Sequence, residues 1–152
     1  MANTFSQIYM HLIFVVDGRL SMIQTDWESD LYAYISGIIT NKNQKLITIN
    51  GTQNHIHLLV SIRTDCCTSN LVRIIKSNSS KYVNEQKWSS GKFKWQDGYG
   101  VFSVSHSQIG KVVKYINNQK EHHKIKLFKD EFLDILKACE IEYKKEYLFD
   151  EI

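Results

Sequence analysis

One stretch decides the fold, His55-Ile56-His57-Leu58-Leu59-Val60-Ser61-Ile62. A row of aliphatic residues occupies every second position from Ile56 to Ile62, which is the period of a β-strand with two different faces. A step of two residues returns to the same face, so the imidazoles of His55 and His57 project together from the other side. We therefore predict a strand that Ile56 anchors in the core and that presents two histidines to a site.

Further patterns extend from this strand in both directions. Strands are predicted over residues 7–16, 46–49 and 99–105, with the turn pair Asn50-Gly51 ending the second, and helices over 25–41 and from about Thr68 or Ser69. The order is strand, helix, strand, strand, helix, strand, as in ferredoxin-like and RNA-recognition-like (RRM-like) domains. We predict an α+β fold, a β-α-β-β-α-β sandwich whose antiparallel sheet carries two helices on one face. The other face is left free for a site or a partner.

Two more helices are predicted after the sandwich. The first covers about residues 107–123, and the second begins near Phe128 and has Phe132, Leu133 and Leu136 on its apolar side. Residues 130–152 form an acidic tail whose carboxylates are expected to be scattered over the surface. A chain of 152 residues has the length of one domain, so we expect a single domain over residues 1–152.

The composition excludes several classes of protein. Hydrophobic residues make up 43% and charged residues 23%, which is typical of a globular protein. No apolar run approaches the roughly 20 residues of a membrane span, and the first residues lack the basic and apolar segments of a signal peptide. The three cysteines form neither a disulfide framework nor a zinc pattern, and there is no glycine-rich phosphate loop. We expect a cytoplasmic protein that uses no membrane and no nucleotide.

The net charge of +3 is unevenly distributed. Residues 63–129 hold 13 basic and 4 acidic side chains, whereas residues 130–152 hold 3 and 8. The basic segment favours an anionic partner such as nucleic acid, although a solvated lysine-rich surface has the same composition. The candidate phosphate contacts are Arg73, Lys76, Lys81, Lys92 and Lys94, interleaved with Trp88, Phe93 and Trp95, which could stack on bases. An ordinary amphipathic helix and an aromatic core would show much of the same pattern.

The helix predicted over residues 107–123 adds polar groups to the two histidines. Tyr115, Gln119 and His122 lie together on one stripe of this helix, beside its apolar stripe. Two imidazoles suit a divalent metal ion, and a tyrosine hydroxyl can act as a nucleophile. Each group also has a simpler interpretation: the histidines as ordinary residues of a half-exposed strand, and Tyr115 as a boundary aromatic in contact with water.

Three other histidines fit structural roles better. We expect His11 to be a hydrogen-bonded structural residue that could approach the site, and His123 to contribute to packing first and to function second. His106 lies at the corner before the helix and is expected to be solvated.

Three motifs resemble those of the HUH endonucleases, and in particular the single-tyrosine HUH transposases of small bacterial insertion sequences. They are Asn54-His55-Ile56-His57-Leu58-Leu59-Val60, Trp95-Gln96-Asp97-Gly98-Tyr99-Gly100-Val101-Phe102-Ser103-Val104-Ser105, and Tyr115-Ile116-Asn117-Asn118-Gln119-Lys120-Glu121-His122-His123. The likeness covers nearly the whole chain, from the first strand to Tyr147-Leu148-Phe149, and places the motifs in the right order on the predicted fold.

The resemblance implies a DNA transposase that cuts and rejoins single-stranded DNA, without ATP, at the hairpin-bearing ends of an insertion sequence. It implies that Tyr115 attacks the scissile phosphate and forms a 5′-phosphotyrosine, and that His55, His57 and Gln119 hold Mg²⁺ or Mn²⁺. His122 would influence the metal ion or the Tyr115 phenol without being a metal ligand itself. The resemblance also implies a homodimer in which the tyrosine helix can complete the partner's active site, and a bacterial cytoplasmic protein that joins the nucleoid when bound to DNA.

Two alternatives stay open at this point. The first is a non-catalytic RRM-like module that binds single-stranded nucleic acid on its open sheet and needs neither both histidines nor Gln119. The second keeps the chemistry but is a domesticated nuclease that acts on chromosomal repeats.

Overall fold

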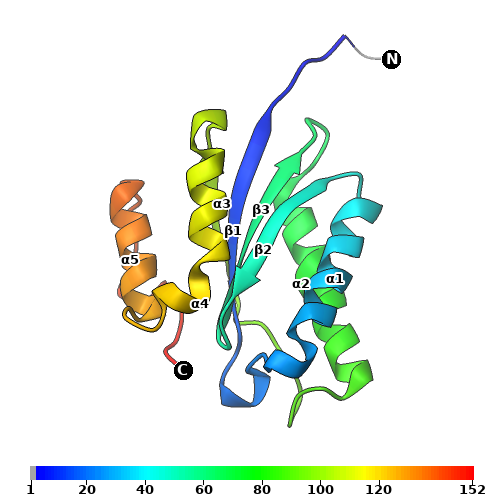
Figure 1. Ribbon diagram of the computed structural model, residues 1–152, viewed down its shortest axis with the longest axis vertical. Coiled ribbons are helices and arrows are strands. Elements are labelled where there is room, and N and C mark those ends of the chain that lie inside the picture. The colour runs from blue at the N-terminus through cyan, green and yellow to red at the C-terminus, as the bar shows by residue number, and fades with distance from the viewer. Residues whose placement is uncertain (1–2) are drawn as a thin grey trace.

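A four-stranded antiparallel sheet is the centre of the molecule. The computed structural model describes residues 3–152 and orders the strands β2-β3-β1-β4 (Figure 1). The strands are β1 (Ile8–Val15), β2 (Lys45–Gly51), β3 (His55–Ile62) and β4 (Gly100–Val104). β1 and β3 pair along their whole length, from Ile8 opposite Ile62 to Val15 opposite His55. This strand order belongs to the ferredoxin-like sandwich, so the predicted fold class is confirmed.

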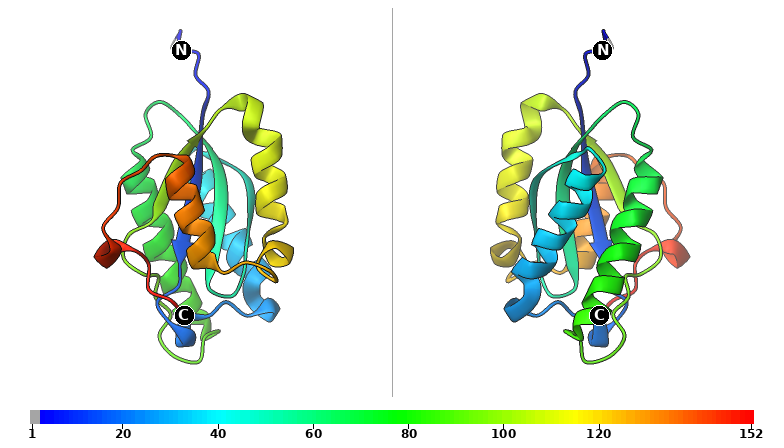
Figure 2. Two further views of the ribbon diagram at one scale, coloured as in Figure 1. Left: turned by 90° about the vertical axis from the view of Figure 1, so that its left-hand side faces the viewer. Right: turned by 90° about the vertical axis from the view of Figure 1, so that its right-hand side faces the viewer.

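One face of the sheet packs against α1 (Thr25–Asn41) and α2 (Thr68–Gln86), which lie side by side in Figures 1 and 2. The apolar stripe of α1 is fully buried at Leu31, Ile35 and Ile39, a spacing of four residues that keeps them on one side of the helix. Phe14 and Leu58 meet these helices from the sheet. This layer is an ordinary apolar core, and it holds β3 rigidly on the side away from its histidines.

The aromatic loop after α2 belongs to this core. Phe93 and Trp95 are 1% and 3% exposed, and Trp95 Nε1 donates a hydrogen bond to Ser79 Oγ at 3.0 Å. Trp88 stacks on the Trp27 ring with 5.5 Å between centroids. Base stacking by Phe93 and Trp95 was therefore the wrong interpretation of this loop, and the aromatic-core interpretation is correct.

The second face of the sheet is covered, contrary to the expectation of an open face. α3 (Ile109–Asn117), α4 (Gln119–His122) and α5 (Phe128–Ala138) lie over it, with α3 and α5 in front of the sheet in the left view of Figure 2. α5 packs Phe132 and Leu136 against Ile13 and Phe102 of the sheet. β1 is therefore buried on both faces from His11 to Val15, and base stacking on an open sheet has no surface available there.

The helix predicted over 107–123 is interrupted. Residues His106–Gln108 form a short 3-10 turn, and Asn118 leaves the helical conformation between α3 and α4. The physical reason lies in β2, where Asn50 Nδ2 donates hydrogen bonds to the carbonyl oxygens of Ile116 and Asn117 at 3.0 and 3.1 Å. Those carbonyls are paired outside the helix, which ends α3 at Asn117.

The predicted turn at Asn50-Gly51 was also misplaced. Both residues belong to β2, where Asn50 pairs with His57 and Gly51 with Ile56, and the chain turns at residues 52–54. Gly51 is required by close backbone approach rather than by a turn, because a Cβ there would lie 2.1 Å from the carbonyl oxygen of His55.

The predicted helix starts differ in detail. α1 begins at Thr25 as expected, with Gln24 as its N-cap and no capping hydrogen bond from a side chain, and Glu28 in its first turn pairs with Lys120 at 2.8 Å. α2 begins after Cys67, without a capping hydrogen bond from a side chain. Among residues 3–152, no helix is both long and apolar enough to cross a membrane.

Candidate metal centre and nucleophile

β3 places His55 and His57 on the face covered by α3, α4 and α5, and both side chains are 0% exposed. Each ring is oriented through its Nδ1 atom. His55 Nδ1 lies 2.7 Å from Asn54 Oδ1 and 3.0 Å from Thr52 Oγ1, and His57 Nδ1 lies 2.7 Å from His11 Nε2. The Nε2 atoms are therefore left facing the helices. Fixing one ring nitrogen so that the other is free is how proteins prepare histidine ligands.

α3 and α4 bring Tyr115 and Gln119 to these histidines, as the stripe on the predicted helix indicated. Gln119 is 0% exposed and its Oε1 lies 3.0 Å from His55 Nε2. Its Nε2 donates a hydrogen bond to Glu131 Oε2 at 3.0 Å, which fixes the direction of the amide. The Tyr115 hydroxyl donates to the same carboxylate oxygen.

Glu131 of α5 is the residue that sequence analysis missed. It is 2% exposed, and its Oε1 lies 3.1 Å from His57 Nε2, 3.7 Å from His55 Nε2 and 3.2 Å from His123 Nε2. The tail carboxylates are thus not all scattered on the surface. A signal was present in the pattern, because Glu131 lies three residues after Phe128 and directly before Phe132, on the side of α5 whose buried residues are Glu131, Phe132 and Leu136. A charged residue on such a stripe indicates a partner inside the protein.

His122 and His123 complete the cluster. His122 Nε2 lies 3.3 Å from Glu131 Oε2 and is not aligned for a hydrogen bond. His123 packs against the ring of His55, with 4.6 Å between centroids, and its Nδ1 lies 2.7 Å from the carbonyl oxygen of Lys126. His123 therefore both packs, as expected, and turns its Nε2 toward the carboxylate.

Burial sets the protonation of the histidines. It lowers the pKa of His55 and of His57, and it lowers the pKa of His11 to about 3 with a further contribution from His57. His11 is therefore a hydrogen-bonded neutral residue beside the site. His106 is exposed, as expected, and its Nδ1 lies 3.3 Å from Gln7 Nε2.

The carboxylate and the phenol are shifted in opposite directions. Burial alone would raise the pKa of Glu131, but the close His123 and His57 rings and the Tyr115 hydroxyl hold it well below its usual range. Burial, the hydrogen bond to Glu131 and the charge of Glu131 raise the pKa of Tyr115. At neutral pH the site therefore holds an ionised carboxylate, a protonated phenol and neutral buried imidazoles.

The donor set fits a divalent cation. Thr52 Oγ1 donates its proton to Asn54 Oδ1 at 2.9 Å, so His55 Nδ1 is left to donate in turn and its Nε2 carries a lone pair. That lone pair faces Gln119 Oε1 and Glu131 Oε1. Both oxygens are hydrogen-bond acceptors, so none of the three atoms supplies a proton to the others. His55, His57 and Glu131 have ligand atoms within 4.8 Å of one another, and all three are buried. A cation satisfies this arrangement, and imidazole with carboxylate is a common ligand set for divalent ions.

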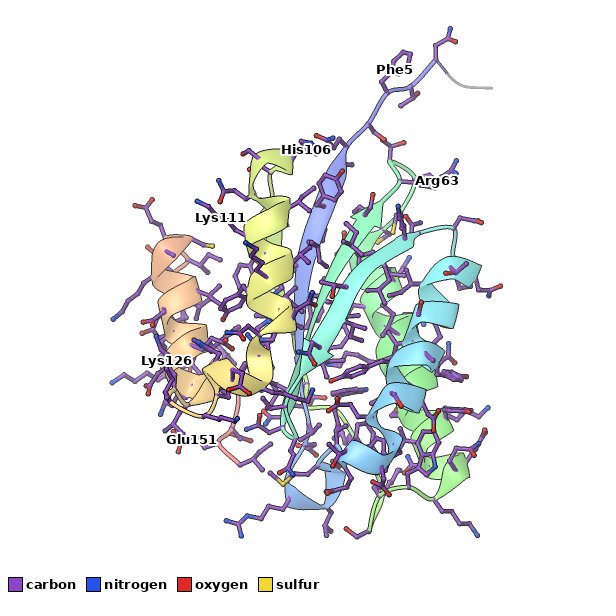
Figure 3. All side chains as sticks on the ribbon, viewed as in Figure 1. Phe5, Arg63, His106, Lys111, Lys126 and Glu151 are labelled. Atoms are coloured by element: carbon purple, nitrogen blue, oxygen red, sulfur yellow. The ribbon has the colours of Figure 1, made fainter. Side chains whose placement is uncertain are left out.

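The predicted phosphate contacts lie elsewhere. Arg73, Lys76 and Lys81 belong to α2, on the opposite face of the sheet from Tyr115, and Lys92 and Lys94 lie in the loop after it (Figure 1). Lys76 Nζ donates hydrogen bonds to the carbonyl oxygens of Gln96 and Gly98, both at 2.7 Å. The site face carries its own basic residues, including Lys111 on α3 (Figure 3).

A strand with two histidines, facing a helix with a tyrosine on a ferredoxin-like sheet, defines the architecture expected of an HUH endonuclease. The comparison with protein families makes this specific. The family model described as transposase, IS200-like, matches residues 4–119. The chain belongs to this family, and it is therefore a transposase, an enzyme that cleaves and rejoins DNA.

Individual relatives agree with this assignment. The ISDra2 transposase TnpA of Deinococcus radiodurans is 24% identical over 122 residues, covering 76% of this chain and 86% of the relative. A solved structure of a candidate transposase from Deinococcus radiodurans R1 has a TM-score of 0.60 at 20% identity, covering 78% of this chain and 95% of that one. The REP-associated tyrosine transposase bound to a REP hairpin has a TM-score of 0.62 at 14% identity, covering 81% and 73%. The two structures support the fold.

Proposed function

We propose that this transposase cleaves single-stranded DNA through Tyr115 and forms a 5′-phosphotyrosine, with a divalent ion held by His55, His57 and Gln119. The observation that carries the proposal is the convergence of the Tyr115 hydroxyl, the Gln119 amide and the Nε2 atoms of two buried histidines around one carboxylate. A half-buried nucleophile beside a prepared cation site is an arrangement suited to phosphodiester cleavage.

The metal site has a carboxylate ligand that the resemblance did not imply. Glu131 Oε1 faces both strand histidines, so the proposed ligands are His55, His57, Gln119 and Glu131. A divalent ion bound by them supplies positive charge that polarises the scissile phosphate. Mg²⁺ and Mn²⁺ both accept oxygen ligands, which Gln119 and Glu131 would supply.

The proposed cleavage transfers a phosphoryl group of the DNA to Tyr115. Tyr115 Oη forms a bond to phosphorus, and the bond from phosphorus to the 3′ oxygen of the preceding nucleotide breaks. The phenol proton passes to Glu131 Oε2, which already accepts its hydrogen bond, and the leaving oxygen takes up a proton from solvent to become a 3′-hydroxyl. A second 3′-hydroxyl attacks the phosphotyrosine to rejoin the DNA and gives its proton to solvent, while the Tyr115 oxygen takes back the proton that Glu131 holds. No nucleotide is consumed, because the energy of the cleaved phosphodiester bond is conserved in the tyrosyl linkage.

The proposed substrate is single-stranded DNA that carries a hairpin. The similar tyrosine transposase bound to a REP hairpin supports a hairpin as the recognised shape. The basic residues 63–129 supply the complementary charge, and Arg73, Lys76, Lys81, Lys92 and Lys94 stay predicted backbone contacts. Assembly as a homodimer and location in the bacterial cytoplasm, at the nucleoid when bound to DNA, also stay predictions.

The test is a denaturing gel of protein mixed with labelled single strands, in Mn²⁺ or in EDTA. The strands are the two ends of the protein's own locus and, separately, a repeated chromosomal hairpin. We expect a protease-sensitive adduct that needs the metal and that disappears in Tyr115→Phe, whereas Tyr147→Phe, at an exposed tyrosine, behaves like the wild type. An adduct that persists in Tyr115→Phe would overturn the mechanism. An adduct with the chromosomal hairpin alone would favour the domesticated nuclease.

A further inference from the structure

A groove opens beside His55, next to the proposed metal centre. It has a volume of about 410 Å³ and is lined by three segments that are distant in the sequence: residues 22–28 at the start of α1, residues 52–54 between β2 and β3, and residues 120–128 from α4 to the start of α5. Ligand sites in proteins have volumes of roughly 300–1,000 Å³, so the groove is large enough for one nucleotide. It lies at the end of the sheet where β3 begins.

The groove and the nucleophile lie on opposite sides of the two strand histidines. His123 and Phe128 line the groove and pack on the His55 ring, with 4.6 and 4.3 Å between centroids. The Tyr115 ring packs on His57 instead, with 5.7 Å between centroids. The His55 and His57 rings are themselves 5.1 Å apart. The order in space is therefore the tyrosine, His57, His55 and the groove.

The chemistry of the proposed cleavage gives this order a meaning. In phosphoryl transfer the attacking and leaving oxygens lie roughly in line, on opposite sides of phosphorus. Tyr115 approaches the phosphate from the side of His57, so the 3′ oxygen that leaves points toward His55. The nucleotide that carries this oxygen, which we call the leaving nucleotide, is thereby directed toward the groove.

We propose that the groove binds the leaving nucleotide, with its base against Leu127 and Phe128 and its backbone phosphate beside Lys124. The proposal rests on the proposed function, because it assigns a subsite to the strand that Tyr115 cleaves. The wall formed by residues 120–128 follows the residues 4–119 that the transposase family model matches. The subsite therefore depends on a segment outside the family pattern.

Three lysines give the groove a positive charge. Lys120, Lys124 and Lys126 line it. Among the described residues that line it, Glu28 is the one carboxylate, and Lys120 Nζ pairs with it at 2.8 Å. Lys124 Nζ pairs with Glu121 at 2.9 Å, and both of these side chains are about two-thirds exposed. Exposed ion pairs contribute little to stability, so a DNA phosphate can replace Glu121 as the partner of Lys124.

Apolar side chains line the groove together with these lysines. Leu127 is 72% exposed, and the neighbouring Phe128 packs on the His55 ring. Met22 and Ile23 belong to the wall at the start of α1. A nucleotide has a flat base and an anionic backbone, so a groove of apolar side chains and lysines matches it. The cleaved strand is the occupant that this position favours, because it must pass the metal centre that the groove adjoins.

The first experiment tests whether Leu127 contacts the base of the leaving nucleotide. Fluorescence anisotropy in Mn²⁺ measures binding of a labelled hairpin strand that the wild type cleaves, and every variant carries Tyr115→Phe so that the strand stays intact. We expect Leu127→Ala to weaken binding about three- to tenfold, because the base loses an apolar contact. Ile125→Ala is the control, since Ile125 is 89% exposed in the same turn but outside the groove, and it should bind like its parent. Thermal unfolding in EDTA checks that the variants fold.

Strands with a single abasic site identify the nucleotide. Removing the base of the leaving nucleotide should weaken binding to the parent protein by the same factor as Leu127→Ala. It should have no further effect on Leu127→Ala, because both changes remove the same contact. Removing the base on the other side of the scissile phosphate should affect the two proteins equally. Additive losses at the leaving nucleotide would overturn the proposal, as would equal losses in Leu127→Ala and Ile125→Ala.

A second comparison tests the phosphate contact. Lys124→Ala should weaken binding about two- to fivefold and lower the salt slope by about one. Lys137→Ala, at an exposed lysine of α5 outside the groove, should change neither quantity. The effect of Lys124→Ala should disappear with a shorter strand that begins at the scissile phosphate and lacks the leaving nucleotide. A loss that persists with this shorter strand would overturn the assignment of Lys124.

The outcomes separate this inference from the proposed function. Wild-type protein that forms no adduct in Mn²⁺ contradicts the proposed function itself. Wild-type adduct that Tyr115→Phe abolishes, together with unchanged binding in Leu127→Ala, leaves the proposed function standing and rejects only the groove as its subsite.

Discussion

The two faces of the sheet are built on different principles. The face under α1 and α2 is apolar, and Phe14 and Leu58 are 0% exposed there. The face under α3, α4 and α5 is as deeply buried, but it collects His11, His55 and His57 around a carboxylate. Neighbouring residues of one strand thus serve stability on one side and chemistry on the other. The comparison shows that burial alone does not distinguish a core from an active site, whereas the number of polar partners does.

Phe14→Ala tests the apolar face and has the largest expected effect on folding. The change leaves a cavity between the sheet and the two helices, and we expect it to lower the free energy of unfolding by about 3–5 kcal/mol. The histidines lie on the other face, so adduct formation per folded molecule stays close to wild type. Urea unfolding and a titration of active sites measure the two quantities.

His57→Ala is the matched change on the other face. We expect metal binding and adduct formation to be lost, with a cost in unfolding free energy in EDTA of about 1–3 kcal/mol, because His11 and Glu131 lose one partner each. A His57→Ala protein that is less stable than Phe14→Ala would contradict the division of labour between the two faces.

The acid sensitivity of the protein should come from the polar face. The pKa of His11, His55 and His57 is lowered in the folded protein, so the unfolded chain binds more protons below its histidine pKa of about 6.5. Their contribution to stability is therefore complete above about pH 6.5 and decreases as the pH falls. Glu131, whose pKa is depressed, adds a loss only below about pH 4.5, on the same side.

Below pH 6.5 each histidine that stays neutral should cost about 1.4 kcal/mol of unfolding free energy per pH unit. Urea unfolding in EDTA at pH 7.5 and 5.5 measures the sum, and His11→Gln should reduce the difference by the share of one histidine. His106→Gln, at an exposed position, is the control and should leave the difference unchanged. Equal stability at the two pH values would show that the buried histidines do not make the protein sensitive to acid.

The sequence predicted the apolar face better than the polar one, for a physical reason. Periods of two and of about four residues are local, and they located β3, α1 and the core stripe without help from distant residues. The end of α3 depends on Asn50, which lies 66 residues before Ile116, and no local pattern contains that hydrogen bond. The roles of Trp88, Phe93 and Trp95 in the loop after α2 were ambiguous, because a basic aromatic segment suits both a core and a nucleic-acid surface.

The site could be predicted in part. His55 and His57 share a face because of strand geometry, and Tyr115 and Gln119 meet because four residues make about one helical turn, even though the helix bends at Asn118. Glu131 required tertiary information, since the identity of its partners depends on α5 folding back over the sheet. Its position on a buried stripe was the only local trace of that contact.

The smallest expected effect is on DNA binding, and it concerns the path of the DNA across the two faces of the sheet. Arg73 on α2 and Lys111 on α3 lie on opposite faces, and the charge of residues 63–129 includes both. If a hairpin strand wraps from the site to the helical layer, Arg73→Ala and Lys111→Ala should each weaken binding two- to fivefold, or about 0.4–1 kcal/mol, and lower the salt slope by about one. Fluorescence anisotropy of a labelled hairpin over a series of salt concentrations measures both. A loss in Lys111→Ala with none in Arg73→Ala would confine the DNA to the face that carries Tyr115, and the apolar face would then support the chemistry through folding alone.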